Sequence, residues 1–215
     1  MRHSEDRFAT PDGIEIYTQT WAADGTPKAA ILIVHGLGEH SGRYQNYVTY
    51  FVPRGYTLYG FDTRGHGRSG GSRGYVERFD RYVDDVDQTA GRIRSDVPGI
   101  PLFILGHSLG SLIALSYGLQ HPGGLAGIIV SGTALQDALE VPGWKRRMAG
   151  VLSRAAPALK MNNGIPLKYL SHDPEVIAAY EADPLTHEWG TPRLATEADA
   201  VRVMINQRAG EWRVD

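Results

Sequence analysis

Apolar and polar residues follow each other in a pattern that predicts alternating strands and helices over the first 130 residues. Residues 14–21 alternate apolar and polar side chains, as a half-exposed strand does, and they follow the turn Pro11-Asp12-Gly13. Residues 29–34 are apolar throughout, which is typical of a strand buried on both faces of a parallel sheet. Further strands are predicted at 56–61, 102–105 and 125–130, with helices over 43–52, 79–95 and 111–120. This alternation predicts an α/β fold with a largely parallel sheet.

The pattern changes after Ser131. From Thr133 to about Thr191 no strand-like run is present, and prolines recur between short amphipathic pieces. Asp173-Pro174 is a good N-cap and first-turn pair for a helix. We therefore expect an α/β core over 1–132, a helical cap over 133–191, and a helix over 192–215 that leads back toward the core. A plain helical tail, with its apolar residues in the core, is the alternative.

Composition excludes several classes of protein. The 215 residues carry 22 basic and 24 acidic side chains, a net charge of −2, and no basic cluster is evident along one face, which argues against nucleic acid as a partner. The absence of cysteine excludes disulfides, thiolate catalysis and cysteine-based metal sites. The N-terminus is too polar for a signal peptide, and no apolar run approaches the ~18 residues of a membrane span. We expect a cytoplasmic protein.

The most informative motif is Gly106-His107-Ser108-Leu109-Gly110, between the predicted strand at 102–105 and the predicted helix at 111–120. A G-x-S-x-G sequence between a strand and a helix predicts a nucleophile elbow. Such a turn is so sharp that side chains at its two glycine positions would collide. It would lift the Ser108 hydroxyl clear of the sheet at a helix N-terminus, where developing negative charge is stabilised. Ser108 is therefore the candidate catalytic nucleophile.

A second motif, residues 35–40, follows the buried strand directly. Its glycines allow the loop to turn so that a backbone N–H, that of Leu37, points toward Ser108. Together with the N–H of Leu109 it would form a two-donor oxyanion hole.

The glycine-rich run 64–71 lacks the lysine and spacing of a phosphate-binding loop, so we interpret it as a structural loop anchored by Asp62 and Arg64. Three histidines at 35, 40 and 66 lie on different loops without clear acidic partners, so we expect no metal site. No cofactor is expected either.

These segments resemble the monoacylglycerol lipase and lysophospholipase group of α/β-hydrolases, also described as serine aminopeptidase-type hydrolases. The resemblance runs from about Thr10 to at least Arg208, and Ser111 stands where that group usually has a second glycine after the elbow. It is carried by His35-Gly36-x-Gly38-Glu39-His40-x-x-Arg43-Tyr44, by Asp62-x-Arg64-Gly65-His66-Gly67-Arg68-Ser69, by the elbow, and by Asp173-Pro174-Glu175-Val176 through Tyr180-x-x-Asp183-Pro184-Leu185. The resemblance implies the α/β-hydrolase fold and hydrolysis of carboxylic esters through an acyl-enzyme on Ser108.

The resemblance also implies two further strands after the cap, which bring the aspartate and histidine of the catalytic triad. No residue of this chain matches either partner in its expected place, so we expect the last strands to be missing from it. His107, His35, His172 and His187 are weaker substitutes for the base. Three hypotheses remain. The first is a hydrolase whose missing segment comes from a fuller natural chain, a second fragment or a partner subunit. The second is a chain active through an internal histidine, and the third is a catalytically degraded protein that binds lipid esters or acts as a scaffold.

A lipid ester is the expected small-molecule partner. The family's usual substrate is a monoacylglycerol. The cap would line an acyl tunnel with the apolar residues Trp144, Met148, Val151, Leu152 and Ile177. Transient contact of the cap with a membrane or micelle is a further expectation. Without a covering strand, 125–130 would be an open sheet edge through which the chain forms a homo-oligomer. The isolated chain is expected to be weakly active at most.

Overall fold

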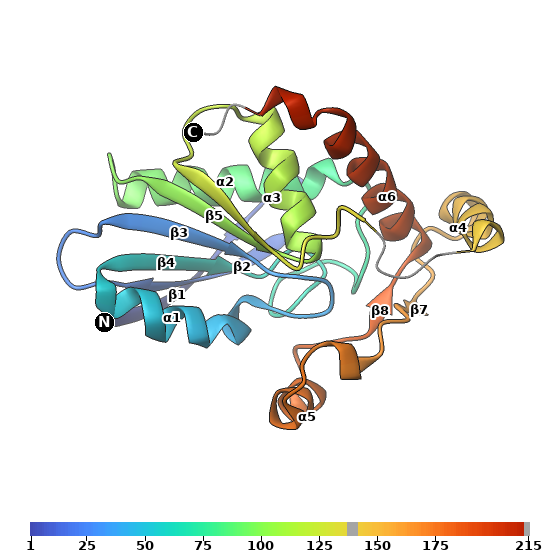
Figure 1. The fold of residues 1–215 in the computed structure, drawn as a ribbon, viewed down its shortest axis with the longest axis horizontal. Coiled ribbons are helices and arrows are strands. Elements are labelled where there is room, and N and C mark those ends of the chain that lie inside the picture. The colour runs from blue at the N-terminus through green and yellow to red at the C-terminus, as the bar shows by residue number, and fades with distance from the viewer. Residues whose placement is uncertain (137–141, 213–215) are drawn as a thin grey trace.

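A six-stranded, largely parallel sheet forms the centre of the molecule (Figure 1). The computed structural model describes residues 1–136 and 142–212. The spatial order of the strands is β1-β2-β4-β3-β5-β6; β4, β3, β5 and β6 run parallel, and the antiparallel strands β1 and β2 continue the sheet beyond β4. Their bounds are Arg2–Ala9 (β1), Glu15–Ala22 (β2), Ala29–Val34 (β3), Tyr56–Phe61 (β4), Leu102–His107 (β5) and Gly127–Ser131 (β6). The predicted fold class is confirmed.

Helices cover both faces of this sheet because the central strands are apolar on both sides. Alternate residues of β3 enter different cores: Leu32 packs in the larger one and Ile33 in the smaller one. The larger core lies under α2 (Asp80–Asp96) and α3 (Leu109–Gln120), and the smaller under α1 (Gln45–Phe51). Figure 1 shows α1 on one face of the sheet and α3 on the other. This layering places the ends of β3 and β5, with their functional loops, at one edge of the sheet.

Most element bounds differ from the expectations by one or two residues, and three further differences are described here; the helix expected over 192–215 ends at Gln207. β1 was not predicted because Arg2–Ala9 is polar and exposed apart from Phe8; its eight residues are held by pairing with β2. The helix expected over 43–52 begins as a 3₁₀ turn at Ser41–Tyr44 and ends in another at Val52–Arg54. The last strand begins at Gly127 rather than at residue 125.

Between β6 and α6 (Pro192–Gln207), the described residues form two helices, α4 (Gly143–Ala155) and α5 (Pro174–Ala182), with a 3₁₀ turn at Leu167–Tyr169. Asp173 caps α5 as predicted, since its carboxylate accepts the Glu175 N–H. The expectation of no strand here is wrong, because β7 (Met161–Asn162) pairs with β8 (Trp189–Gly190). Strands of two residues are too short to leave a periodic pattern.

The chain then returns to the core through α6 (Pro192–Gln207), followed by a 3₁₀ turn at Ala209–Glu211. Leu194 and Ile205 of α6 enter the larger core, so this helix is anchored at both ends. The division at 132 and 191 stays a prediction. Within 1–136 and 142–212, no helix is both long and apolar enough to cross a membrane.

Candidate active site

Ser108 occupies a strained turn between β5 and α3. Its backbone has φ 51° and ψ −116°, and among the described residues it is the only non-glycine residue with positive φ. Such strain persists only where the surrounding structure imposes it, and it is concentrated at functional sites. A Cβ on Gly106 would lie 2.4 Å from the Gly110 carbonyl oxygen, and one on Gly110 would lie 2.0 Å from that of Val34. The elbow therefore requires both glycines, as the sequence predicted.

Hydrogen bonds to the end of β6 and the loop after it hold this turn. The Ser108 N–H donates to the Ser131 carbonyl at 3.0 Å. The buried Ser111 hydroxyl donates to the Ser108 carbonyl at 2.5 Å and also lies 3.1 Å from the Thr133 hydroxyl. Sequence reasoning treated Ser111 only as a tolerated departure from the family pattern. Its role depends on Thr133, 22 positions away, which no local signal identifies.

The loop after β3 lies directly against the elbow. A Cβ on Gly36 would stand 3.2 Å from the Cβ of Ser108. The Glu39 carboxylate accepts the Gly36 N–H at 2.6 Å and the Tyr44 hydroxyl at 2.9 Å, which fixes the loop. No hydrogen bond from the N–H of Leu37 or Leu109 to another atom is present within the described ranges. The backbone N–H groups of Leu37 and Leu109, beside Ser108, are thus available as hydrogen-bond donors.

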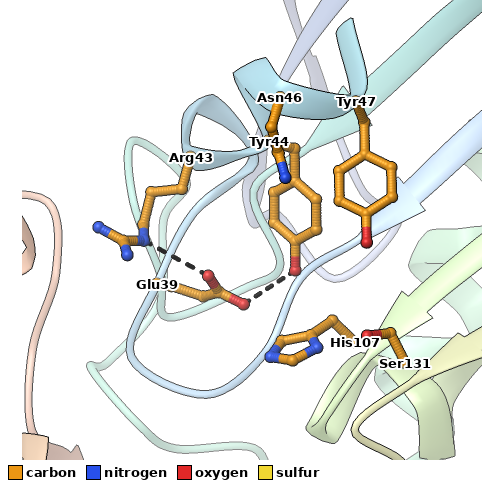
Figure 2. Close-up of a pocket in the computed structure, with 7 residues that line it drawn as sticks. All are labelled: Glu39, Arg43, Tyr44, Asn46, Tyr47, His107 and Ser131. Atoms are coloured by element: carbon orange, nitrogen blue, oxygen red, sulfur yellow. Dashed lines mark hydrogen bonds and ion pairs between the residues drawn. The ribbon is translucent and has the colours of Figure 1, made fainter. Parts of the chain in front are cut away.

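A polar cavity of about 180 Å³ opens beside the elbow (Figure 2). Figure 2 shows Glu39 between Arg43 and Tyr44, with His107 and Ser131 on the opposite side of the cavity. Burial, followed by the charge of Glu39, raises the pKa of Tyr44, which therefore stays a neutral hydrogen-bond donor at physiological pH. The lining residues are Glu39, Arg43, Tyr44, Asn46, Tyr47, His107 and Ser131.

The glycine-rich loop after β4 has the structural role that was predicted. The buried Asp62 carboxylate accepts hydrogen bonds from the backbone N–H groups of Ser41 and Arg68, at 2.9 and 2.8 Å. Arg64 donates to Asp85 and Asp12, each at 2.7 Å. The hydrogen bond from Arg64 outweighs the burial of Asp12 and holds the pKa of that carboxyl well below its usual range. Both predicted anchors are confirmed.

The three histidines of these loops have separate structural contacts. The His35 Nε2 accepts the Thr63 N–H at 2.9 Å, so its Nδ1–H donates to the Gly36 carbonyl at 2.8 Å. Burial lowers the pKa of His35 and keeps it neutral. His40 Nε2 lies 2.8 Å from Asp183 of the cap. His66 is buried, with its Nδ1 3.1 Å from the Arg64 carbonyl oxygen.

The cap is hydrogen-bonded to the loop after β3 at Gly38. The Gly38 carbonyl accepts the Tyr180 hydroxyl and the His187 N–H, each at 2.9 Å. Gly38 has φ +77°, and a Cβ there would stand 2.1 Å from the His187 carbonyl oxygen. The His187 ring lies 4.9 Å from that of His66. These contacts between distant segments place the cap over the loop that carries Leu37.

None of the candidate substitute bases is hydrogen-bonded to the Ser108 hydroxyl in the part of the chain that the structure describes. Both ring nitrogens of His35 are hydrogen-bonded elsewhere, the His187 ring lies tilted against that of His66, and His172 is exposed. His107 is the last residue of β5 and lines the polar cavity beside the elbow. These contacts disfavour the hypothesis that an internal histidine acts as the base.

The apolar residues expected to line an acyl tunnel are arranged differently. Trp144, Met148 and Val151 of α4 are exposed, and neither they nor Leu152 and Ile177 line the polar cavity beside Ser108. The reason is that α4 packs on α6 through its other face, where Ser153 is buried. The tunnel interpretation of the three exposed residues is wrong in this arrangement.

A parallel sheet with a strained serine elbow, and a loop with backbone donors beside it, defines an α/β-hydrolase. Residues 25–215 match the family model described as "Serine aminopeptidase, S33". The chain belongs to this family, and the resemblance seen in the motifs is confirmed.

Several relatives carry names that refer to acylglycerols. The chain is 36% identical over 189 residues to a monoacylglycerol lipase of Mycolicibacterium smegmatis, covering 88% of this chain and 67% of that protein. It is 35% identical over 175 residues to human monoglyceride lipase, covering 81% of this chain and 57% of the human protein. A crystal structure of the Paleococcus ferrophilus monoacylglycerol lipase matches with a TM-score of 0.79 and 29% identity, over all of this chain and 75% of the other. The chain thus spans between a half and three quarters of these relatives.

Proposed function

We propose that this chain carries the nucleophile and oxyanion loops of a serine hydrolase that cleaves carboxylic esters, most closely those of the monoacylglycerol type. The observation that carries the proposal is the strained Ser108 with the 35–40 loop against it. Family membership and the names of the relatives support the substrate class.

In the proposed reaction, the Ser108 Oγ attacks the ester carbonyl carbon and loses its proton to a general base. The carbonyl oxygen becomes an oxyanion, which accepts hydrogen bonds from the N–H groups of Leu37 and Leu109. Collapse breaks the ester bond, releases the alcohol with a proton, and leaves the acyl group on Ser108. Water then hydrolyses this acyl-enzyme to the carboxylic acid and restores the serine.

The oxyanion donors and substrate binding alone would accelerate hydrolysis by only ~10³–10⁴-fold over water. Because no described histidine contacts the Ser108 hydroxyl, a second candidate function is retained: a protein that binds lipid esters without turning them over. Under the first proposal, adding the family's aspartate strand and histidine loop at the C-terminus raises hydrolysis strongly. Under the second, the extended chain binds the ester but leaves it intact.

A fluorophosphonate probe tests the nucleophile. The extended chain should be labelled on Ser108, and Ser108→Ala should abolish the label, whereas Ser116→Ala, at a buried serine in the helix after the elbow, should keep it. Labelling that survives Ser108→Ala would contradict the proposal.

A series of p-nitrophenyl esters tests the substrate class. The value of kcat/KM should rise with acyl length, because each buried CH₂ adds at most ~0.8 kcal/mol of binding free energy. A preference for acetyl esters or peptide amides would exclude lipid esters as the substrate class.

Contact of the cap with a lipid surface also belongs to this proposal. It is supported by the exposed apolar side chains of α4 and by the lipid class of the proposed substrate.

A further inference from the structure

Three buried nitrogen atoms lie where the cap packs on the loop that joins β4 to α2, and none has a hydrogen-bond partner among the described residues. They are His66 Nε2, Arg73 Nη1 and His187 Nε2. The His66 side chain is fully buried, and its ring centre lies 4.9 Å from that of His187. Unpaired buried polar atoms are rare in native proteins, so such a group indicates a bound ligand.

The other ring nitrogen of each histidine determines what its Nε2 offers. The His66 Nδ1 lies 3.1 Å from the Arg64 carbonyl oxygen, which can only accept, so Nδ1 carries the proton and Nε2 a lone pair. The His187 Nδ1 accepts the Trp189 N–H at 3.2 Å, so its Nε2 carries the proton. In their neutral forms the two rings thus present one acceptor and one donor, and these are not hydrogen-bonded to each other.

Arg73 adds a positive charge that no carboxylate neutralises within residues 1–136 and 142–212. Its Nη2 donates to the Gly67 carbonyl at 2.7 Å, whereas its buried Nη1 has no partner there. Burial first, and then charged or titratable neighbours that include Arg73, lower the pKa of His66 and of His187. The guanidinium charge therefore acts on both rings. A partly buried arginine is usually paired with an anion.

The groups that face the two rings make this region electropositive. His35 comes from the loop after β3, Arg73 from the loop before α2, and His187 from the cap. No carboxylate is among the groups that act most strongly on His66 or His187. A water molecule would satisfy the nitrogens but leave the charge of Arg73 uncompensated. An anion supplies both an acceptor and the opposite charge.

We propose that His187 Nε2–H and Arg73 Nη1–H bind a small monovalent inorganic anion, such as chloride, between the cap and the core. Protonation of the neighbouring His66 Nε2 replaces a lone pair that opposes the anion by a third donor. Binding should therefore tighten as the pH falls, because the bound anion favours the protonated form of His66.

Such an anion would join the cap to two loops of the core. The backbone N–H of His187 donates to the Gly38 carbonyl at 2.9 Å, in the loop after β3. Next to Arg73, the Gly74 carbonyl accepts the hydroxyl of Thr191, the N-cap of α6, at 2.8 Å. The inference goes beyond the proposed function, since it concerns how the cap is held and not how an ester is cleaved.

Anomalous diffraction from crystals grown in sodium bromide tests the site directly. We expect an anomalous peak in contact with both His187 Nε2 and Arg73 Nη1 in the wild type, and no peak there in Arg73→Gln. A water molecule that bromide does not replace at this position would overturn the proposal.

Thermal unfolding in sodium chloride and in sodium gluconate, at equal ionic strength, measures binding in solution. Gluconate is too large to reach nitrogens that are buried. A dissociation constant of about 10 mM would make the melting temperature about 3–6 °C higher in ~0.1 M chloride than in gluconate. This difference between the salts should be larger near about pH 6 than near about pH 8, because His66 is the added donor.

Two substitutions at the site should abolish the difference between the salts. Arg73→Gln removes the charge but keeps a donor for the Gly67 carbonyl. His187→Asn keeps an acceptor for the Trp189 N–H and removes the donor that replaces it at Nε2. The matched control is Arg78→Gln, at an exposed arginine of the same loop, and it should respond to chloride like the wild type. Far-UV circular dichroism verifies that each variant is folded.

Two further results would overturn the proposal. One is a chloride effect of equal size in the wild type and in Arg73→Gln. The other is a bromide peak without any chloride effect on stability, which would mean an adventitious ion only. A chloride effect that is equal at both pH values would refute the role of His66. Because none of these measurements uses an ester, failure of the proposed hydrolysis leaves them unaffected.

Discussion

The hydroxyl oxygen of Ser111 lies 2.5 Å from the carbonyl oxygen of Ser108, one helical turn before it. The same hydroxyl accepts the N–H of Ala134 at 3.3 Å and lies 3.1 Å from the hydroxyl of Thr133. One buried side chain thus joins the carbonyl group of the proposed nucleophile to the loop after β6. A glycine at this position would leave the Ser108 carbonyl without this bond.

We therefore expect Ser111→Ala to destabilise the protein by about 1–3 kcal/mol, since it removes one of two hydrogen bonds to the Ser108 carbonyl and the acceptor of the Ala134 N–H. It should also slow fluorophosphonate labelling of the extended chain by about ten- to hundredfold, because small displacements of a nucleophile are costly. Urea unfolding and the labelling rate are the two measurements.

Ser116→Ala provides the matched control, since Ser116 is also fully buried in α3 but accepts its hydrogen bond from Gln120. It should leave the labelling rate unchanged. If the two variants slow labelling equally, Ser111 has no particular role in positioning the elbow.

Gly110→Ala should disrupt the elbow. The added Cβ would meet the carbonyl oxygens of Val34 at 2.0 Å and His35 at 2.6 Å, and backbone atoms of the central strand have little freedom to move. We expect a loss of at least about 2 kcal/mol in the free energy of unfolding.

The control is Gly91→Ala on the exposed side of α2, where an added Cβ meets nothing within 4 Å. It should stabilise the protein by about 0.8–1.0 kcal/mol, the difference in helix propensity between the two residues. Equal effects of the two substitutions would refute the steric explanation of the motif. Chemical denaturation at constant pH measures both.

Stability should fall at mildly acidic pH because of His66 and His187. Burial first, and then nearby positive or titratable groups that include His35 and Arg73, lower the pKa of each histidine below its ordinary value of 6.5. The unfolded chain therefore binds more protons than the folded one once the pH drops below about 6.5. Each histidine that stays neutral in the folded state then lowers the free energy of unfolding by up to about 1.4 kcal/mol for each further unit that the pH falls.

Thermal unfolding between about pH 8 and about pH 5 measures this effect, with the loss of stability beginning near the unfolded pKa. His66→Gln should flatten the profile in this window, although it lowers stability at neutral pH. His172→Gln, at an exposed histidine, should leave the profile unchanged. A wild-type profile that is flat down to pH 5 would contradict the prediction.

Association through β6 is the fourth prediction. In the described sheet β6 is an edge strand, and its residues Ile129 and Val130 are exposed at 43% and 41%. Open apolar edges pair with other strands. The 215-residue chain should therefore form concentration-dependent oligomers in sedimentation velocity, and Val130→Lys should shift it toward the monomer. Val203→Lys, at an exposed position on α6, is the control. An equal shift by both variants would exclude the edge as the interface.

Local patterns were sufficient to predict much of this protein. The runs at 29–34 and 56–61 are largely apolar on both faces, so they predicted central strands without any knowledge of how the rest of the chain packs. The elbow was predictable because its glycines are required by backbone atoms a few residues away or on the adjoining strand. Asp62 and Arg64 were identified as anchors because charged residues in an otherwise glycine-rich loop need partners.

What the amino-acid sequence determined by itself was thus the order of the central strands and helices, the α/β class and the elbow that presents Ser108, since each depends on neighbours along the chain. The tertiary structure alone decided that β1 pairs despite its polar residues, that Ser111 reaches Thr133, that His187 rests on His66, and that Trp144 faces outward. The last three depend on the packing of segments tens of residues apart, whereas the first depends on pairing with the neighbouring strand β2. Hydrogen bonding and burial between such segments follow from the whole arrangement, and no window of sequence contains both partners.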